Sequence, residues 1–124
     1  MAQLKKRILV VEDEHDILEL LNIILQRAGY EVHLCDNGRN AIAKLKEVHP
    51  HLMILDVMLP GLDGKAIAEA VSRDGELSGT SIIIASALEA SEKMFAGNPL
   101  VKDFCFKPFR TSTLLEKVKR VMGD

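Results

Sequence analysis

Five polar residues that can take part in phosphoryl or metal chemistry stand directly after short apolar runs of this sequence. They are Glu12, Asp13, Asp56, Ser86 and Lys107. Carboxylates that lie close together repel one another, so three of them kept ionised invite a hard divalent cation with oxygen ligands, for which we expect Mg²⁺. A hydroxyl and a lysine ammonium beside that cation would hold the oxygens of a transferring phosphoryl group. One of the carboxylates would then be the nucleophile.

Each of these residues, taken alone, also has a purely structural interpretation. The acidic run Glu12-Asp13-Glu14 can cap a helix and oppose its dipole. Asp56 can open a turn, and Lys107-Pro108 can belong to a surface loop. Because the polar residues recur at the ends of four apolar runs, we favour the chemical interpretation of the set as a whole.

The elements that must position these residues follow an alternating pattern of strand-length apolar runs and segments with helical spacing. The predicted strands are residues 7–11, 31–35, 52–55, 81–85 and 103–106. Apolar residues at helical spacing are Ile17, Leu21, Ile24 and Ala28; Ile42, Leu45 and Val48; Ile67, Ala70 and Val71; and Leu114, Val118 and Val121. The cluster Thr111-Ser112-Thr113 is expected to cap the last helix. This alternation is typical of a parallel sheet covered by helices on both faces.

The character of the runs predicts the order of the strands. Residues 8–11, 53–55 and 82–85 are continuously apolar, as expected inside a sheet, whereas 31–35 and 103–106 alternate and belong at its edges. With right-handed crossovers, this gives an α/β fold: a flavodoxin-like, doubly wound, five-stranded parallel sheet with strand order 2-1-3-4-5. Ligands of such sheets bind beyond the carboxyl ends of the strands, where the five polar residues are expected.

Length and charge narrow the class of protein. The 124 residues, 48% of them hydrophobic, suit one domain with a real core, which we expect to span residues 1–124. With 16 basic and 18 acidic residues, the net charge of -2 favours no direct contact with nucleic acid. No apolar run approaches a membrane span of about 18 residues, and the N-terminal sequence turns acidic early, so we expect a cytoplasmic location. Cys35 and Cys105 are expected to be small core residues.

Four motifs together resemble receiver domains of two-component response regulators. They are VVEDE (10–14), LDVMLPGLDG (55–64), SA (86–87) and FKPF (106–109). The resemblance covers essentially the whole chain, and the motifs are specific in combination, in their order and in their distances from one another. It implies that Asp56 accepts a phosphoryl group from a histidine kinase or a phosphotransfer protein.

The resemblance also implies roles for the other polar residues. Mg²⁺ would be held by Asp13, Asp56 and the backbone carbonyl of Met58, with Glu12 acting through metal-bound water. Ser86 and Lys107 would contact the phosphoryl oxygens. Two features complete the set of implied roles: Ser86 and Phe104 would form the switch, and Lys107-Pro108 would be a cis peptide.

The predicted function is a phosphorylation-dependent signalling switch, which assists its own phosphorylation and dephosphorylation but is not otherwise an enzyme. Its output would be an unknown partner, a fused output domain or a phosphorylation-dependent homodimer. One alternative is a Mg²⁺-dependent aspartyl-phosphate hydrolase, although Met58 stands where that class needs a second acid. Another is a flavin-binding module, although EDEH (12–15) is the electrostatic opposite of a phosphate loop. The third is a degenerate receiver, although its acceptor, metal and lysine positions are filled.

The segment between the fourth and fifth strands departs most from the family. Gly97 is a natural helix end, and Pro99 cannot continue a helix, so a helix starting no earlier than about Glu89 should end near Ala96. We expect residues 88–102 to be short, irregular or mobile compared with the other helices. Because the family usually meets partners beside this helix, the departure indicates a different partner or dimer mode.

Overall fold

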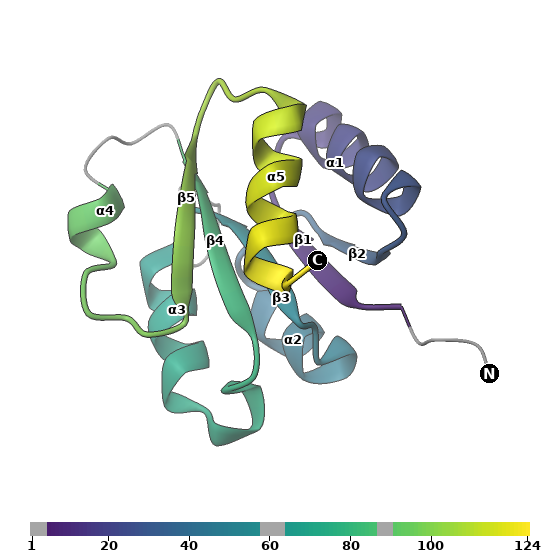
Figure 1. The fold of residues 1–124 in the computed structure, drawn as a ribbon. Coiled ribbons are helices and arrows are strands. Elements are labelled where there is room, and N and C mark those ends of the chain that lie inside the picture. Colours follow the sequence, from purple (N-terminus) through teal and green to yellow (C-terminus); the bar gives the residue numbers. More distant parts are fainter. Residues whose placement is uncertain (1–4, 58–63, 87–90) are drawn as a thin grey trace.

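The computed structural model describes residues 5–57, 64–86 and 91–124, which form a five-stranded parallel sheet covered by helices on both faces (Figure 1). The strands are β1 (Arg7–Val11), β2 (Glu31–Cys35), β3 (Leu52–Asp56), β4 (Ser81–Ser86) and β5 (Val101–Phe106). They lie in the order β2-β1-β3-β4-β5, and all neighbours are parallel. The predicted flavodoxin-like fold and its strand order are therefore confirmed.

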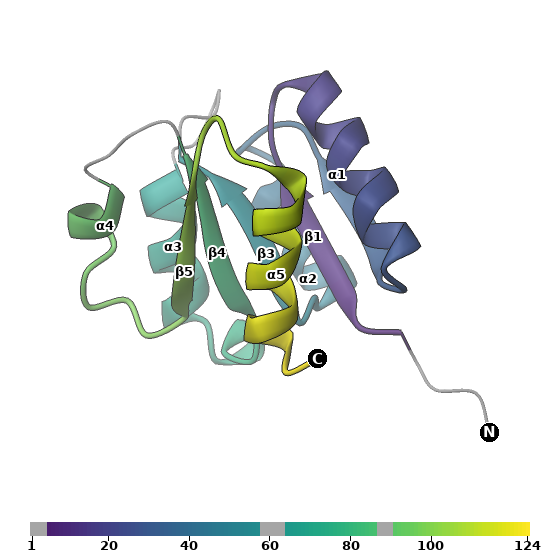
Figure 2. The same cartoon turned by 45° about the horizontal axis from the view of Figure 1, so that its top comes forward.

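The helices divide between the two faces of this sheet. They are α1 (His15–Arg27), α2 (Ala41–Val48), α3 (Gly64–Arg73), α4 (Ser91–Met94) and α5 (Thr111–Met122), with a 3₁₀ turn at Gly75–Leu77. Helices α1 and α5 cover one face, and α2 and α3 cover the other (Figure 2). Among the described residues, no helix has the length and hydrophobicity needed to span a membrane.

Apolar side chains fill a core on each face of the sheet. Every residue of β3 is buried, and in β4 all are buried except Ser81. In β1, Ile8 packs on the α1 and α5 side while Leu9 packs on the α2 and α3 side. Consecutive residues of a central strand thus enter opposite cores, which explains the continuously apolar runs. Cys35 and Cys105 are buried free thiols, as predicted.

The fifth strand begins earlier than predicted. It starts at Val101 rather than at residue 103, so that predicted boundary is wrong. Val101 pairs with Ile82, but the next residue, Ile83, pairs with Asp103, which leaves Lys102 as an extra residue in the ladder. The polar pair Lys102-Asp103 looks like the end of a strand, although backbone pairing continues across the irregularity.

The start of α5 also differs from the prediction. Arg110 occupies the N-cap position, with φ -82° and ψ 140°, and its side chain makes no capping hydrogen bond. Thr111-Ser112-Thr113 forms the first turn of the helix itself, so the prediction that this cluster supplies the cap is wrong. A capping hydroxyl must sit on a residue with non-helical backbone angles, and here that residue is an arginine.

The fourth helix is short, as predicted. It has 4 residues and ends at Met94, slightly before the predicted end at Ala96. Turns then lead to β5, and Gly97 adopts φ +88°, a conformation that favours a residue without Cβ. Residues 87–90, which the prediction included, lie outside the described residues.

Candidate functional site

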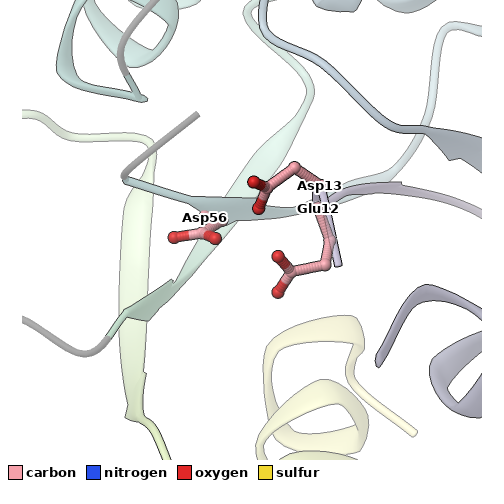
Figure 3. A group of neighbouring side chains, drawn as sticks. All are labelled: Glu12, Asp13 and Asp56. Carbon is pink, nitrogen blue, oxygen red and sulfur yellow. The ribbon is translucent and has the colours of Figure 1, made fainter. Parts of the chain in front are cut away.

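Three carboxylates meet at the carboxyl edge of the sheet, between β1 and β3. Glu12 and Asp13 follow β1, and Asp56 is the last residue of β3. Because β1 and β3 are neighbours, their ends bring these side chains together. One oxygen of each carboxylate lies within 4.8 Å of those of the other two, and Figure 3 shows the three side chains around a shared space. The structure thus unites acids that lie in separate segments of the sequence.

The acidic cluster is partly sealed from water. Counted as whole residues, Glu12 and Asp56 are 2% and 6% exposed, whereas Asp13 is exposed. Burial of neighbouring carboxylates is unfavourable unless a positive charge and hydrogen bonds compensate for the lost water. A cation, either a side chain of the protein or an ion from solution, is therefore needed to stabilise these carboxylates.

Lys107 supplies such a charge from the end of β5. Its Nζ donates to Glu12 Oε1 at 2.5 Å and to Asp56 Oδ2 at 3.1 Å. Its backbone N–H donates to the Ser86 carbonyl at 2.8 Å, which ties the end of β5 to that of β4. The Lys107-Pro108 peptide is cis, as the resemblance implied. The lysine thus connects the acids that follow β1 and end β3.

Burial and neighbouring charges shift the pKa values of Glu12 and Lys107. Burial raises the pKa of Glu12 to about 7; the hydrogen bond from Lys107 opposes this effect, and the adjacent Asp56 adds to it. Burial alone would lower the pKa of Lys107, but its bond to Glu12 and the charge of Asp56 outweigh burial and raise it. At neutral pH, Lys107 is therefore charged, and Glu12 holds its proton more tightly than an exposed glutamate does.

Ser86 lies on β4, which neighbours β3, and Phe104 lies on β5, the next strand of the sheet. Ser86 ends β4 and is buried, one residue beyond Ala85, which pairs with Asp56. Phe104 lies on β5 and pairs with Ile84. The predicted switch residues are therefore two rungs apart on neighbouring strands. Met58, whose carbonyl was predicted to hold the metal, lies outside the described residues.

The acidic run could have served to cap α1, and one hydrogen bond supports that interpretation. Glu14 occupies the N-cap position of α1, but its side chain makes no capping hydrogen bond. Glu12 Oε2 accepts a hydrogen bond from the Glu14 N–H at 3.3 Å. The main neighbours of Glu12 are instead Lys107 and the other carboxylates of the cluster.

Gly64 supports the site and was not predicted to do so. It opens α3, and its N–H donates to the Val57 carbonyl at 2.9 Å. A Cβ at this position would lie 2.7 Å from Val57 Cα and 2.8 Å from the Asp56 carbonyl oxygen. Only glycine lets α3 approach the end of β3 so closely. The sequence did contain a signal for this role: Gly64 stands between the candidate nucleophile Asp56 and a predicted helix.

Gly64→Ala is expected to lower the free energy of unfolding by about 1 to 3 kcal/mol, because its methyl group would collide with backbone that cannot easily move. Urea denaturation would measure the change. Gly79→Ala is the matched control: a Cβ there meets nothing within 4 Å, so a change of at most about 0.5 kcal/mol is expected. Equal losses in the two variants would show that the close approach at Gly64 does not matter.

Comparison with known proteins identifies the family of the chain. Residues 8–119 match the response regulator receiver domain family. The chain belongs to this family. The receiver domain is 30% identical to the DNA-binding response regulator MtrA of Mycolicibacterium smegmatis over 120 residues, which cover 96% of this chain and 51% of that protein. It thus spans about half the length of the curated relatives that it matches.

Solved structures agree with this assignment. The chemotaxis response regulator CheY4 of Vibrio cholerae is 30% identical with a TM-score of 0.86, over 95% of the receiver domain and 99% of CheY4. The response regulator TrrA of Thermotoga maritima, in complex with Mg²⁺-BeF, is 34% identical with a TM-score of 0.81, over 94% and 98% of the two chains. The acidic cluster of the receiver domain likewise fits Mg²⁺, because its three carboxylates converge and Asp13 is open to water.

Proposed function

We propose that this receiver domain is a phosphorylation-dependent switch of two-component signalling, with Asp56 as the phosphoacceptor and a histidine kinase or phosphotransfer protein as the donor. The position of Asp56 carries the proposal: it lies beside Glu12 and Asp13, and Lys107 Nζ is 3.1 Å from its Oδ2. A carboxylate so placed can attack phosphorus while the lysine neutralises the transferring oxygens. The domain is not a classical enzyme, because the acceptor of the phosphoryl group is its own side chain and not a separate substrate.

The proposed transfer is a displacement at phosphorus. An oxygen of Asp56 forms the new P–O bond as the P–N bond of the donor phosphohistidine breaks, and the electron pair leaves with the imidazole nitrogen. Lys107 exchanges its contact with Asp56 for one with a phosphoryl oxygen, and the Ser86 hydroxyl donates to another. Water later hydrolyses the acyl phosphate, which restores Asp56 and releases inorganic phosphate. The same residues thus assist phosphorylation and dephosphorylation of their own domain.

We propose that Asp13, Asp56 and the Met58 carbonyl hold Mg²⁺, with Glu12 acting through bound water. The burial of two carboxylates and the exposure of Asp13 support this set of ligands. Bound Mg²⁺ would neutralise negative charge on the carboxylates and on the phosphoryl oxygens.

Asp13→Asn is expected to weaken Mg²⁺ binding at least about tenfold, because it removes the one exposed carboxylate of the cluster. NMR titration with MgCl₂ would measure the affinity. Asp16→Asn, which changes an acid in the first turn of α1, is the control and should leave the affinity unchanged. Equal Mg²⁺ affinity in Asp13→Asn and the wild type would contradict the proposal that Asp13 is a metal ligand.

Ser86 and Phe104 are proposed as the switch. A phosphoryl group adds charge and strong acceptors at the sheet edge, toward which the Ser86 hydroxyl would move. The Phe104 ring could then enter the vacated space and change the surface formed by α4, β5 and α5. Because α4 has only 4 residues here, we propose that this surface serves a partner or dimer mode of its own.

The output is proposed to be a partner protein or a fused output domain, with a phosphorylation-dependent homodimer as a further form of signal. MtrA is a DNA-binding regulator that this chain matches over 51% of its length. For the receiver itself, taken as one domain over residues 1–124, the net charge of -2 supports no direct contact with nucleic acid. We propose a cytoplasmic location, where such phosphotransfer partners act.

Incubation with a small-molecule phosphodonor and Mg²⁺, followed by mass measurement of the intact protein, tests the proposed acceptor. The wild type is expected to gain the mass of one phosphoryl group, and Asp56→Asn is expected to gain none. Asp36→Asn is the matched control, because Asp36 follows β2 as Asp56 ends β3, and it should be labelled like the wild type. Undiminished labelling of Asp56→Asn would overturn the proposal.

A further inference from the structure

Three phenylalanines form a row that joins the α4 segment to β5. Phe104 stands in the middle: its ring centroid lies 6.4 Å from that of Phe95, at an interplanar angle of 53°, and 6.3 Å from that of Phe106, at 9°. Both distances fall in the range in which aromatic rings attract each other beyond the area that they bury. Figures 1 and 2 both show β5 between α4 and α5, and Phe104 packs against the core cluster that contains Phe95.

The two ends of the row are held differently. Phe95 is 4% exposed and belongs to the core beneath α2 and α3. Phe106 is 39% exposed, although it is a large apolar side chain. Stacking on Phe104 covers part of its surface, which is favourable in water. The row therefore has a fixed inner end and an outer end near the edge of the sheet that carries the acidic cluster.

The register of β4 and β5 places Phe106 at the level of Ser86. Ser86 pairs with Phe106, and Ile84 pairs with Phe104. Paired residues of neighbouring strands share a face of the sheet, so Phe104 lies two residues below both Ser86 and Phe106 on that face. Phe106 lies along β5 from Phe104, whereas Ser86 lies across on β4, so a Phe104 ring that moves across toward Ser86 changes its stacking on Phe106.

The backbone of Phe104 is tied in place by charged side chains. Its N–H donates to Asp103 Oδ1 at 2.8 Å, and its carbonyl accepts a hydrogen bond from Lys117 Nζ at 2.5 Å. Rotation of the ring about its side-chain torsions thus costs less than displacement of the strand. The energy needed for that rotation depends on the contacts of the Phe104 ring with Phe95 and Phe106.

We propose that Phe95 and Phe106 are positioning residues for Phe104: they hold its ring in the unphosphorylated arrangement, and the stack with Phe106 must break before Phe104 can follow Ser86. This inference rests on the proposed function, since it takes Ser86 and Phe104 as the switch. Loss of the Phe106 ring would favour the phosphorylated conformation without touching the acceptor. The fraction of molecules ready to bind a phosphoryl group would rise accordingly.

Binding of beryllofluoride, a phosphoryl mimic, in the presence of Mg²⁺ tests this inference by NMR titration. Phe106→Leu is expected to bind beryllofluoride about 2- to 10-fold more tightly than the wild type. This factor is the stabilisation by one aromatic pair, expressed as a change of about 2- to 10-fold in an equilibrium constant. Phe106→Tyr keeps the ring and should bind like the wild type. Leu20→Ala removes a similarly exposed side chain of α1 and should change nothing. A variant that only loosened the fold would bind more weakly, so the sign of the effect identifies positioning.

Equal or weaker binding by Phe106→Leu, with normal binding by the wild type, would overturn the inference. Absence of binding by the wild type would instead contradict the proposed function. In that case a double-mutant cycle of Phe104→Leu and Phe106→Leu, measured by urea unfolding, tests the stack alone. A coupling of about 2- to 10-fold in the unfolding constant supports the stack, and additive effects overturn it.

Discussion

Lys107→Met is expected to lower the free energy of unfolding by about 3 to 5 kcal/mol at pH 8 without divalent cations. Lys107 Nζ bonds Glu12 and Asp56, and the three side chains are only 15%, 3% and 8% exposed. Methionine retains much of the apolar stem but removes the charge, so both carboxylates stay buried without the cation between them. The loss should be smaller at pH 5, because Glu12 can then take up a proton.

Lys46→Met is the matched control for this prediction. Lys46 Nζ lies 3.6 Å from Asp74 Oδ2, and these side chains are 52% and 28% exposed. An exposed pair of this kind is worth at most about 1 kcal/mol. Urea unfolding followed by circular dichroism would give both values. A loss in Lys107→Met no larger than that in Lys46→Met would contradict the assignment of Lys107 as the compensating charge.

The free energy of unfolding is also expected to fall by about 3 kcal/mol as the pH rises from about 4.5 to 8 without divalent cations. The pKa of Glu12 is raised from 4.5 to about 7 by burial, so the folded protein binds this proton more tightly than the unfolded chain does. The stabilisation is complete below the unfolded value and is lost as the pH rises through 7. Acidification within this window should therefore stabilise the fold.

Glu12→Gln isolates this effect, because glutamine resembles the protonated acid and does not titrate. The difference in unfolding free energy between the wild type and Glu12→Gln should change across pH 4.5 to 8, because the two proteins differ only at this carboxyl group. Asp124, whose pKa is lowered by its bonds to Lys6 and Tyr30, loses its contribution only at lower pH. Parallel curves for the two proteins would show that Glu12 does not titrate within this window.

The sequence was sufficient to predict the sheet because its central runs have a clear physical cause. Side chains of β1 enter both cores, as Ile8 and Leu9 do, and only a continuously apolar run satisfies both. The strand order follows from this distinction between central and edge strands. The carboxyl ends of β1 and β3 then place Glu12, Asp13 and Asp56 at one edge, whatever the details of the loops.

Features set by single contacts could not be predicted in the same way. The early start of β5 depends on one extra residue, Lys102, which polarity patterns treat as the end of a strand. The approach of Gly64 to Val57 is a tertiary contact that no local pattern contains. Lys107 donates hydrogen bonds to both Glu12 and Asp56, and this sharing depends on the distances between the ends of β5, β1 and β3. Spacing in the sequence indicates which residues meet, but not how closely.

The location of the phosphoryl group tests the central claim most directly. The protein is labelled with a phosphodonor and Mg²⁺, reduced with borohydride, which converts an aspartyl phosphate to homoserine, and then digested for peptide mapping by mass spectrometry. Because Asp56 combines the end of β3 with neighbouring acids and the Lys107 ammonium, homoserine is expected at position 56. Homoserine at Asp13 instead, or a labelled protein whose phosphoryl group resists borohydride, would contradict the assignment of Asp56 as the acceptor.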